Sequence, residues 1–245
     1  MKLDVFLSPA GLTSNEVAGR SVFVVDVLRT TTSICAALHH GARGVVPVAS
    51  VAEASRLAQT LGPEDVLLCG ERDCEPIEGF ALGNSPLEMA DATVRGKTLV
   101  MTTTNGTGTL LAAQSGSDVF VAAAANLTLA GQRAEQLLNS RHELAILCSG
   151  RDAQFGLDDA YTAGRLAMLA LGGHRRRKGL NDGALAAVDL VCRYGTNWER
   201  PLLLSAAGRE LTRRGRGADV VDAACQDRYP VLPVLRDRRI IVEAA

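Results

Sequence analysis

The chain has 245 residues, of which 47% are hydrophobic, 22% charged and 4% aromatic, and its formal net charge is −1. This composition suits one α/β domain with a large core. Because the net charge is near zero, no overall electrostatic field draws the chain to nucleic acid. The sequence also contains no run of ~18 apolar residues, which a membrane span would need. We therefore expect neither nucleic acid nor membrane as a partner, and a cytoplasmic location.

Short β-branched runs alternate along the chain with Ala- and Leu-rich segments of helical periodicity. The predicted strands cover residues 3–7, 22–27, 44–48, 66–69, 98–102, 119–122 and 144–148. The predicted helices cover residues 32–40, 52–61, 86–91, 107–114, 127–140, 158–171 and 182–192. This alternation predicts a layered α/β/α fold with a mostly parallel sheet. Near the C-terminus, the Pro-containing segment 229–235 and the apolar segment 239–243 indicate an edge strand, where Pro is tolerated.

Two stretches of the sequence repeat each other. Residues 22–48 correspond to residues 98–122, and Leu68-Cys-Gly-Glu-Arg-Asp73 then matches Leu147-Cys-Ser-Gly-Arg-Asp152 in the same order. Two βαβ runs can match by chance, but the ordered second match favours duplication of a β-loop-α-β-α-β unit. We therefore expect a single domain over residues 1–245, built from two internally similar subdomains at about 20–90 and 96–172, with a helical C-terminal part at 173–245.

Each predicted half contains a polar loop between a strand and a helix. In the second half, Gly106 permits a tight turn, and the first N–H groups of the following helix are unpaired, which favours an anion. In the first half, Arg29 can donate two parallel hydrogen bonds to phosphate, carboxylate or sulfonate. These polar residues could instead be helix caps, but their equivalent positions favour anion binding. The expected substrate-binding residues of the loops are Thr30, Thr31, Thr104, Asn105, Gly106 and Thr107.

Four carboxylates accompany these loops. Asp26 lies inside an apolar strand, where it must be paired or bind a metal, and Glu71 ends another strand beside Arg72. Asp158 and Asp159 begin a helix, where they could be simple caps. Together the four carboxylates could supply the oxygen ligands that Mg²⁺ prefers. We therefore expect Asp26, Glu71, Asp158 and Asp159 as metal ligands, and Asp26, Glu71 and Arg29 as catalytic residues.

The loop before residue 86 adds one more candidate. Ser85, Pro86 and Glu88 have the spacing of a helix-capping box, which explains these residues by local structure alone. The capping box does not explain Asn84. We therefore expect Asn84 to line the site, with Arg72 from the preceding strand end.

These segments together resemble the 2-phosphosulfolactate phosphatase family. The resemblance covers residues 22–170 and rests on Val25-Asp-Val-Leu-Arg-Thr-Thr-Thr32, Gly70-Glu-Arg72, Gly79-Phe-Ala-Leu-Gly-Asn-Ser-Pro86, Thr103-Thr-Asn-Gly-Thr107, Asn126, Cys148-Ser-Gly150, Asp158-Asp159 and Ala163-Gly164. It implies Mg²⁺-dependent hydrolysis of 2-phospho-3-sulfolactate to 3-sulfolactate and phosphate, a step towards coenzyme M. It also implies that Asn126, Ser149 and Gly150 bind substrate.

The chain departs from the family pattern at two places. The family usually has Arg-Ala-Thr-Thr-Thr where Arg29-Thr-Thr-Thr-Ser33 stands, and often Glu-Asp where Asp158-Asp159 stands. Other hypotheses stay open: a phosphatase for another small phosphorylated acid, a non-catalytic anion-binding protein, or a lyase or isomerase. The expected partner is a small acidic phosphate ester, and a homo-oligomer is possible.

Overall fold

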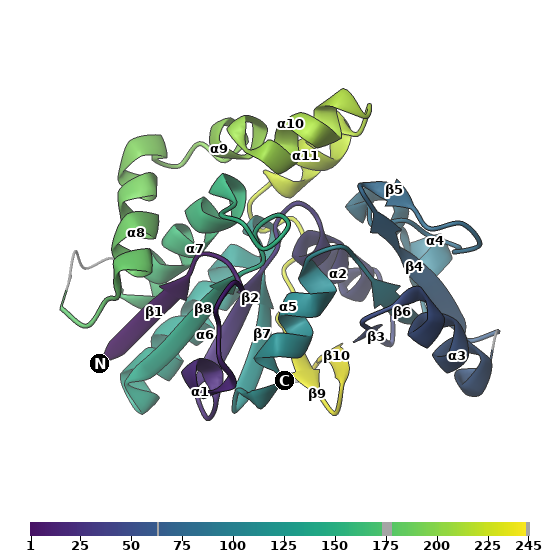
Figure 1. Ribbon diagram of the computed structural model, residues 1–245, viewed down its shortest axis with the longest axis horizontal. Helices are drawn as coiled ribbons and strands as arrows, with labels where there is room; N and C mark the ends of the chain where they lie inside the picture. Colours follow the sequence, from purple (N-terminus) through teal and green to yellow (C-terminus); the bar gives the residue numbers. More distant parts are fainter. Residues whose placement is uncertain (63, 173–177, 244–245) are drawn as a thin grey trace.

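A computed structural model describes residues 1–62, 64–172 and 178–243 (Figure 1). Within these residues the strands form one ten-stranded mixed sheet in the order β1-β8-β2-β7-β9-β10-β3-β6-β4-β5. The strands are β1 (Lys2–Phe6), β2 (Ser21–Val25), β3 (Gly44–Pro47), β4 (Val66–Arg72), β5 (Glu75–Pro76), β6 (Thr98–Thr102), β7 (Asp118–Ala122), β8 (Glu143–Cys148), β9 (Pro233–Arg236) and β10 (Arg239–Val242).

The helices lie between these strands along the chain. They are α1 (Ser14–Val17), α2 (Thr30–His39), α3 (Val51–Leu61), α4 (Asp91–Val94), α5 (Gly106–Ala112), α6 (Leu127–Arg141), α7 (Leu157–Ala170), α8 (Asp182–Tyr194), α9 (Glu199–Leu204), α10 (Ala206–Arg213) and α11 (Gly217–Ala223), with 3₁₀ turns η1 (Pro86–Glu88), η2 (Ala113–Ser115) and η3 (Ala124–Asn126). The predicted α/β class and mostly parallel sheet are confirmed. The predicted helix 86–91 is wrong, because this segment forms η1, and α4 begins only at Asp91.

The sheet contains two groups of parallel strands. Strands β1, β8, β2 and β7 are parallel to one another, as are β3, β6 and β4. All five residues of β2 are buried, which is typical of a central parallel strand that is covered on both faces. Helices α6 and α7 pack against β8, and α3 packs against β4 and β6. This packing forms the apolar core that supports the strand ends.

The hairpin β9–β10 joins the two parallel groups. Strand β9 pairs antiparallel with β7, and β10 pairs antiparallel with β3. The predicted edge strand is therefore wrong, because both strands lie in the middle of the sheet. Pro233 is tolerated there because it is the first residue of β9, where its missing N–H removes no interior ladder bond. The side chains of Val234 and Ile240 are buried, which explains why this segment is apolar.

The strand order bears on the predicted duplication. Strand β2, from the first predicted half, lies between β7 and β8 of the second half. Strand β6, from the second half, lies between β3 and β4 of the first half. Each predicted half thus places its first strand among the strands of the other. The similarity of the halves stays a prediction, but neither half forms a separate sheet among the described residues.

The C-terminal helices cover the ends of the central strands. In Figure 1, α9, α10 and α11 lie across the top of the sheet, above β2 and β7. Residues 173–177, where the predicted helical part begins, lie outside the described residues. No helix among the residues described is long and apolar enough to cross a membrane.

Candidate active site

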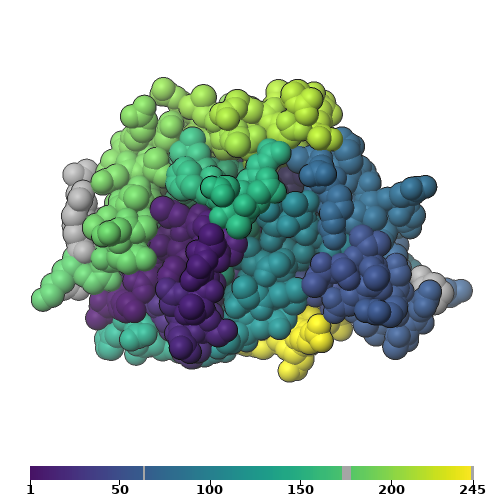
Figure 2. Space-filling model, viewed as in Figure 1, coloured from purple at the N-terminus to yellow at the C-terminus, as the bar shows by residue number. Residues whose placement is uncertain are grey.

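A small pocket lies where four strand ends meet the start of α7 and helix α10. Loops after β2, β4, β6 and β8 form most of its wall, and Ala207 and Leu211 of α10 close one side. Figure 2 shows the yellow-green α10–α11 segment beside the blue residues near 75 and the green-teal residues near 150. The lining residues are Asp26, Leu28, Arg29, Thr30, Glu71, Asp73, Cys74, Asn84, Thr104, Asn105, Gly150, Arg151, Asp152, Asp158, Asp159, Ala207 and Leu211.

The two strand–helix loops meet at the base of this pocket. A Cβ on Gly106 would overlap Asp26 Oδ2 and Thr30, so the start of α5 touches the start of α2 only because residue 106 is Gly. The Thr30 hydroxyl donates to Thr103 Oγ1 at 3.2 Å. The amide of Asn84 donates to Thr30 Oγ1 at 3.4 Å. The predicted convergence of the two loops is therefore present in the fold.

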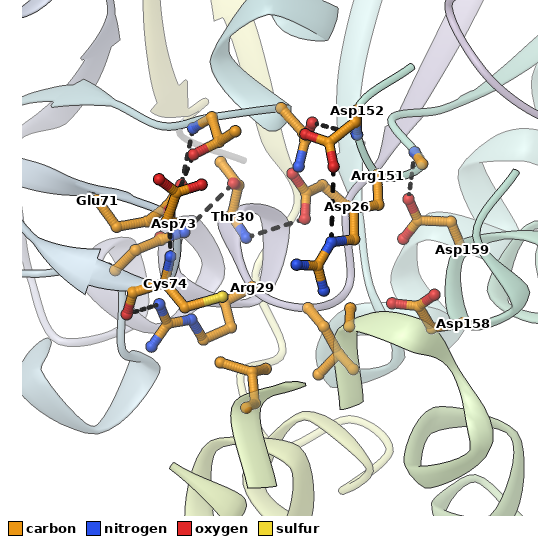
Figure 3. A pocket seen from close by; sticks show the side chains of 17 residues that line it. Asp26, Arg29, Thr30, Glu71, Asp73, Cys74, Arg151, Asp152, Asp158 and Asp159 are labelled. Atoms are coloured by element: carbon orange, nitrogen blue, oxygen red, sulfur yellow. Dashed lines mark hydrogen bonds and ion pairs between the residues drawn. The ribbon is translucent and has the colours of Figure 1, made fainter. Parts of the chain in front are cut away.

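Asp26 and Asp158 are buried carboxyl groups that face this pocket (Figure 3). Burial raises the pKa of Asp26 to about 7; hydrogen bonds from Thr30 oppose this rise, and the charges of Asp158 and Glu71 add to it. Burial likewise raises the pKa of Asp158 to about 6, although backbone N–H groups, Ser205 and the charge of Arg151 stabilise its anion. Both groups are therefore held above their ordinary range, which favours a bound proton or cation.

Asp159 holds two backbone segments together. Its Oδ1 accepts from Val27 N and its Oδ2 accepts from Gly150 N, both at 2.9 Å. Burial and the charges of Asp158 and Asp26 raise the pKa of Asp159 well above its ordinary value. Asp159 therefore ties the loop after β2 to the loop after β8.

Glu71 holds another pair of segments. Its Oε1 accepts from Thr104 N at 2.7 Å, and its Oε2 accepts from Cys74 N at 2.8 Å and from Thr104 Oγ1 at 3.1 Å. These donors occupy both carboxylate oxygens, so Glu71 fixes the loop after β6 against the turn after β4. In this arrangement Glu71 positions the pocket wall.

Arg29 lines the pocket, but its guanidinium already has partners. Its Nη1 donates to Asp219 Oδ2 at 2.7 Å, and its Nη2 donates to the Cys74 carbonyl at 3.2 Å. Ser85 Oγ donates to the other oxygen of Asp219 at 2.6 Å. The side chains of Arg29 and Asp219 are 3% and 5% exposed, so this is a buried ion pair. The pair anchors α11 to the loop after β2.

Six of the expected substrate-binding residues do not line the pocket. Thr31 and Thr107 cap their own loops, because their hydroxyls accept from Asp26 N and Thr103 N. Arg72 donates to Thr102 Oγ1, and Asn126 bonds the backbone of residues 121, 123 and 231. Ser149 is buried, and its hydroxyl has no hydrogen-bond partner. Gly106 packs against Asp26 and Thr30. Thr30, Asn84, Thr104, Asn105 and Gly150 do line the pocket.

Several pocket residues were not expected from the sequence. Arg151 and Asp152 lie on the turn after β8, and Asp73 and Cys74 lie on the turn after β4. The internal match between residues 68–73 and 147–152 contained a signal for these turns, because both copies end in Arg-Asp. Asp219 gave no such signal, because its partner Arg29 is 190 positions away in the sequence.

Comparison with known proteins identifies the family of this chain. The family model described as 2-phosphosulpholactate phosphatase matches residues 6–238, which include every residue of the pocket. The chain belongs to the 2-phosphosulfolactate phosphatase family. Proteins named "Probable 2-phosphosulfolactate phosphatase" are similar over nearly their whole length. That of Symbiobacterium thermophilum is 36% identical over 94% of this chain and 97% of its own, and that of Thermotoga petrophila is 34% identical over 95% of each.

The family name describes phosphoric monoester hydrolases. The chain also resembles a relative from Deinococcus radiodurans. That protein, with the same printed name, is 39% identical over 86% of each chain. The resemblance inferred from the sequence motifs is therefore confirmed at the level of the family. The roles of individual residues stay predictions.

The carboxylates of the pocket can be compared with the ligands that Mg²⁺ requires. Among the described residues, no group of three or more His, Cys, Asp or Glu side chains is arranged to hold a metal ion. Mg²⁺ is, however, usually held by one or two carboxylates together with waters and substrate phosphate. Asp26 and Asp158 fit this smaller set, since both face the pocket and both have a raised pKa that a cation would lower. Glu71 and Asp159 fit it less well because backbone N–H groups occupy their oxygens.

Proposed function

We propose that this chain is a Mg²⁺-dependent phosphatase that hydrolyses 2-phospho-3-sulfolactate to 3-sulfolactate and phosphate. The observation that carries the proposal is the match of residues 6–238 to the family model, because that match contains the whole pocket with its buried carboxyl groups. By the same reasoning we propose that the reaction serves a route to coenzyme M, in which 3-sulfolactate is the product passed on.

The pocket residues divide into two roles in this proposal. Asp26 and Asp158 would hold the cation, which when bound would supply positive charge for the phosphoryl oxygens and for activation of water. Glu71 and Asp159 keep the surrounding loops in place through their backbone hydrogen bonds. Because the pocket wall is fixed before substrate arrives, little reorganisation opposes catalysis.

Polar and cationic groups on the other walls suit an acidic substrate. The ester carries a phosphate, a carboxylate and a sulfonate, all of which need donors or cations. Thr30, Asn84 and Asn105 bring a hydroxyl and two amides to the pocket, and Arg151 brings a positive charge. Hydrolysis breaks one P–O ester bond; the water oxygen joins phosphorus, and the leaving alkoxide takes a proton.

We also propose that the two halves arose by duplication. Asp73 and Cys74 have φ values of 51° and 68°, and Asp152 and Ala153 have φ values of 51° and 57°. These pairs occupy the same positions of the two sequence copies, and each forms a tight turn lining one side of the same pocket. Two consecutive non-Gly residues at positive φ are uncommon, although Asp237 and Arg238 of the β9–β10 turn form a third such pair. Their recurrence at matched positions supports a common origin for the two halves.

The experiment is a panel of phosphomonoesters assayed for phosphate release with purified chain. We expect turnover of 2-phospho-3-sulfolactate with Mg²⁺, loss of turnover in EDTA and recovery when Mg²⁺ is restored. Preference for another phosphorylated acid would revise the substrate and keep the reaction. Thermal stabilisation by the esters without release of phosphate would instead identify a non-catalytic anion-binding protein. Conversion without free phosphate would indicate a lyase or isomerase.

A further inference from the structure

We infer that Arg151 binds the acid group that accompanies the phosphate ester, and so makes the enzyme selective for phosphorylated acids over simple phosphomonoesters. This inference rests on the proposed function and adds a specificity residue to it. The acid group is a carboxylate or a sulfonate, since both present oxygen acceptors that a planar guanidinium can bind through two parallel hydrogen bonds.

The backbone that carries Arg151 is held firmly. Arg151 N donates to Gln154 O and Gln154 N donates to Arg151 O, which closes a tight hairpin turn. Asp152 N donates to Asn105 Oδ1 at 3.0 Å, and Gly150 N donates to Asp159 Oδ2 at 2.9 Å. Gly150 has φ of 60°, and a Cβ there would overlap Gln154 O, so this turn requires Gly. The Cα of Arg151 therefore has a fixed position at the pocket rim.

The side chain of Arg151 is held much more loosely than its backbone. It is 37% exposed, and its Nη1 makes a hydrogen bond of 3.3 Å to the Ala206 carbonyl. Its Nε lies 3.7 Å from the exposed carboxylate of Asp152. Such a contact between exposed groups contributes little energy, so a ligand anion can replace it at small cost. Figure 3 shows the guanidinium extending into the pocket.

Arg29, the other arginine of the pocket lining, is differently placed. Its two terminal nitrogens have protein acceptors, and its side chain is 3% exposed. Moving Arg29 towards a ligand would leave Asp219 buried without its counter-charge, which is costly. Arg151 is therefore the lining arginine that can turn to a substrate group without breaking a buried ion pair.

The charges around the pocket also require a cation for an acidic substrate. Asp26, Asp158 and Asp159 line the same pocket, and all three carboxyl groups are buried. An ester with two further acid groups would be repelled by these carboxylates. A cation held by Asp26 and Asp158 would neutralise the phosphate, and the remaining acid groups would still need positive charge. Arg151, on the rim beside α10, offers positive charge for one of these groups.

Steady-state kinetics of Arg151→Gln on two substrates tests this inference. With 2-phospho-3-sulfolactate we expect kcat/KM to fall by about 10- to 100-fold, mainly through KM, because a charge-assisted bidentate contact is lost. With phenyl phosphate, which has no second acid group, we expect a change of no more than about threefold. Arg151→Lys should recover part of the loss on the acidic ester. Equal losses on both substrates, or no loss on either, would overturn the inference.

Two further arms complete the design. The phosphate esters of lactate and of 2-hydroxyethanesulfonate carry a carboxylate and a sulfonate respectively. The ester whose kcat/KM falls more in Arg151→Gln identifies the group that Arg151 binds. Arg209→Gln is the matched control, since Arg209 is exposed on α10 and does not line the pocket. If the wild-type chain hydrolyses none of the esters, the proposed function fails. Calorimetric titration with 3-sulfolactate then decides separately: weaker binding by Arg151→Gln supports the inference, and unchanged binding refutes it.

Discussion

The guanidinium of Arg29 and the carboxylate of Asp219 form a buried ion pair, with Nη1 and Oδ2 2.7 Å apart. The two residues are 190 positions apart in the sequence, so the pair joins the loop after β2 to the C-terminal helix α11. Ser85 donates to the same carboxylate at 2.6 Å, which brings a third segment to one point. One wall of the pocket therefore depends on Asp219, which lies outside both predicted halves.

Replacing Asp219 by Asn should destabilise the protein strongly. The guanidinium of Arg29 would remain buried without a counter-charge, and we expect the free energy of unfolding to fall by about 3–5 kcal/mol. Urea denaturation followed by circular dichroism measures this change. Asp237→Asn is the control, because Asp237 is exposed on the β9–β10 turn and its replacement should change stability by less than about 0.5 kcal/mol. Equal stability of the two variants would show that the ion pair is unimportant.

Replacing Glu71 by Gln should loosen the loop after β6. Gln has one carbonyl oxygen where Glu71 uses both carboxylate oxygens to accept from Thr104 N and Cys74 N. We expect a loss of about 1–3 kcal/mol, since a buried N–H loses its acceptor. Hydrogen exchange should accelerate at Thr104 and Cys74, whereas Glu78→Gln, at an exposed residue, should leave both amides unchanged. Unchanged protection in Glu71→Gln would contradict the positioning role.

Stability of the metal-free chain should fall as the pH rises from 4 to 7. The pKa of Asp26 is raised from 3.8 to about 7 in the folded state, so the folded state binds its proton more tightly than the unfolded state. Its stabilising contribution is therefore complete below pH 4 and is lost through pH 7. Asp26→Asn should weaken this dependence, leaving the part due to Asp158 and Asp159, and raise stability at pH 8 by about 2–4 kcal/mol relative to wild type. Denaturation in EDTA at several pH values tests this, and parallel curves for both proteins would contradict it.

Magnesium should stabilise the folded chain. A cation between Asp26 and Asp158 binds only the folded state, and about 2.7 kcal/mol is expected at a Mg²⁺ concentration 100 times Kd. The melting temperature should therefore rise with Mg²⁺ at pH 7.5. Asp158→Asn should abolish most of the rise, and Asp237→Asn should retain it. An identical rise in both variants would place the cation elsewhere.

The local patterns of the sequence predicted much of the fold. All seven predicted strands are present. The β-branched runs of the strands and the Ala-rich runs of the helices are local features of the sequence, so they indicate each element without knowledge of distant contacts. The positions of polar residues at strand ends and helix starts also predicted part of the site. Four residues predicted in this way line the pocket: Thr30, Thr104, Asp26 and Asp158.

Features that depend on distant contacts were not predictable in this way. The hairpin β9–β10 looked like an edge strand because nothing in residues 229–243 indicates that two parallel groups flank it. The role of Asp219 depends on a partner in the first half, and the placement of Arg151 depends on a turn that Asn105 and Asp159 hold. Asn126 was expected to bind substrate, but its amide satisfies backbone groups away from the pocket.

The rate of phosphate release from 2-phospho-3-sulfolactate by wild-type chain and Asp26→Asn, both at saturating Mg²⁺, tests the central claim most directly. The account predicts turnover by the wild type and at least a ~100-fold lower kcat in the variant, because removing a group that stabilises transition-state charge has this scale of effect. The variant should remain folded, with Asp237→Asn as active as wild type. Full activity of Asp26→Asn would contradict the claim that this pocket is the catalytic site.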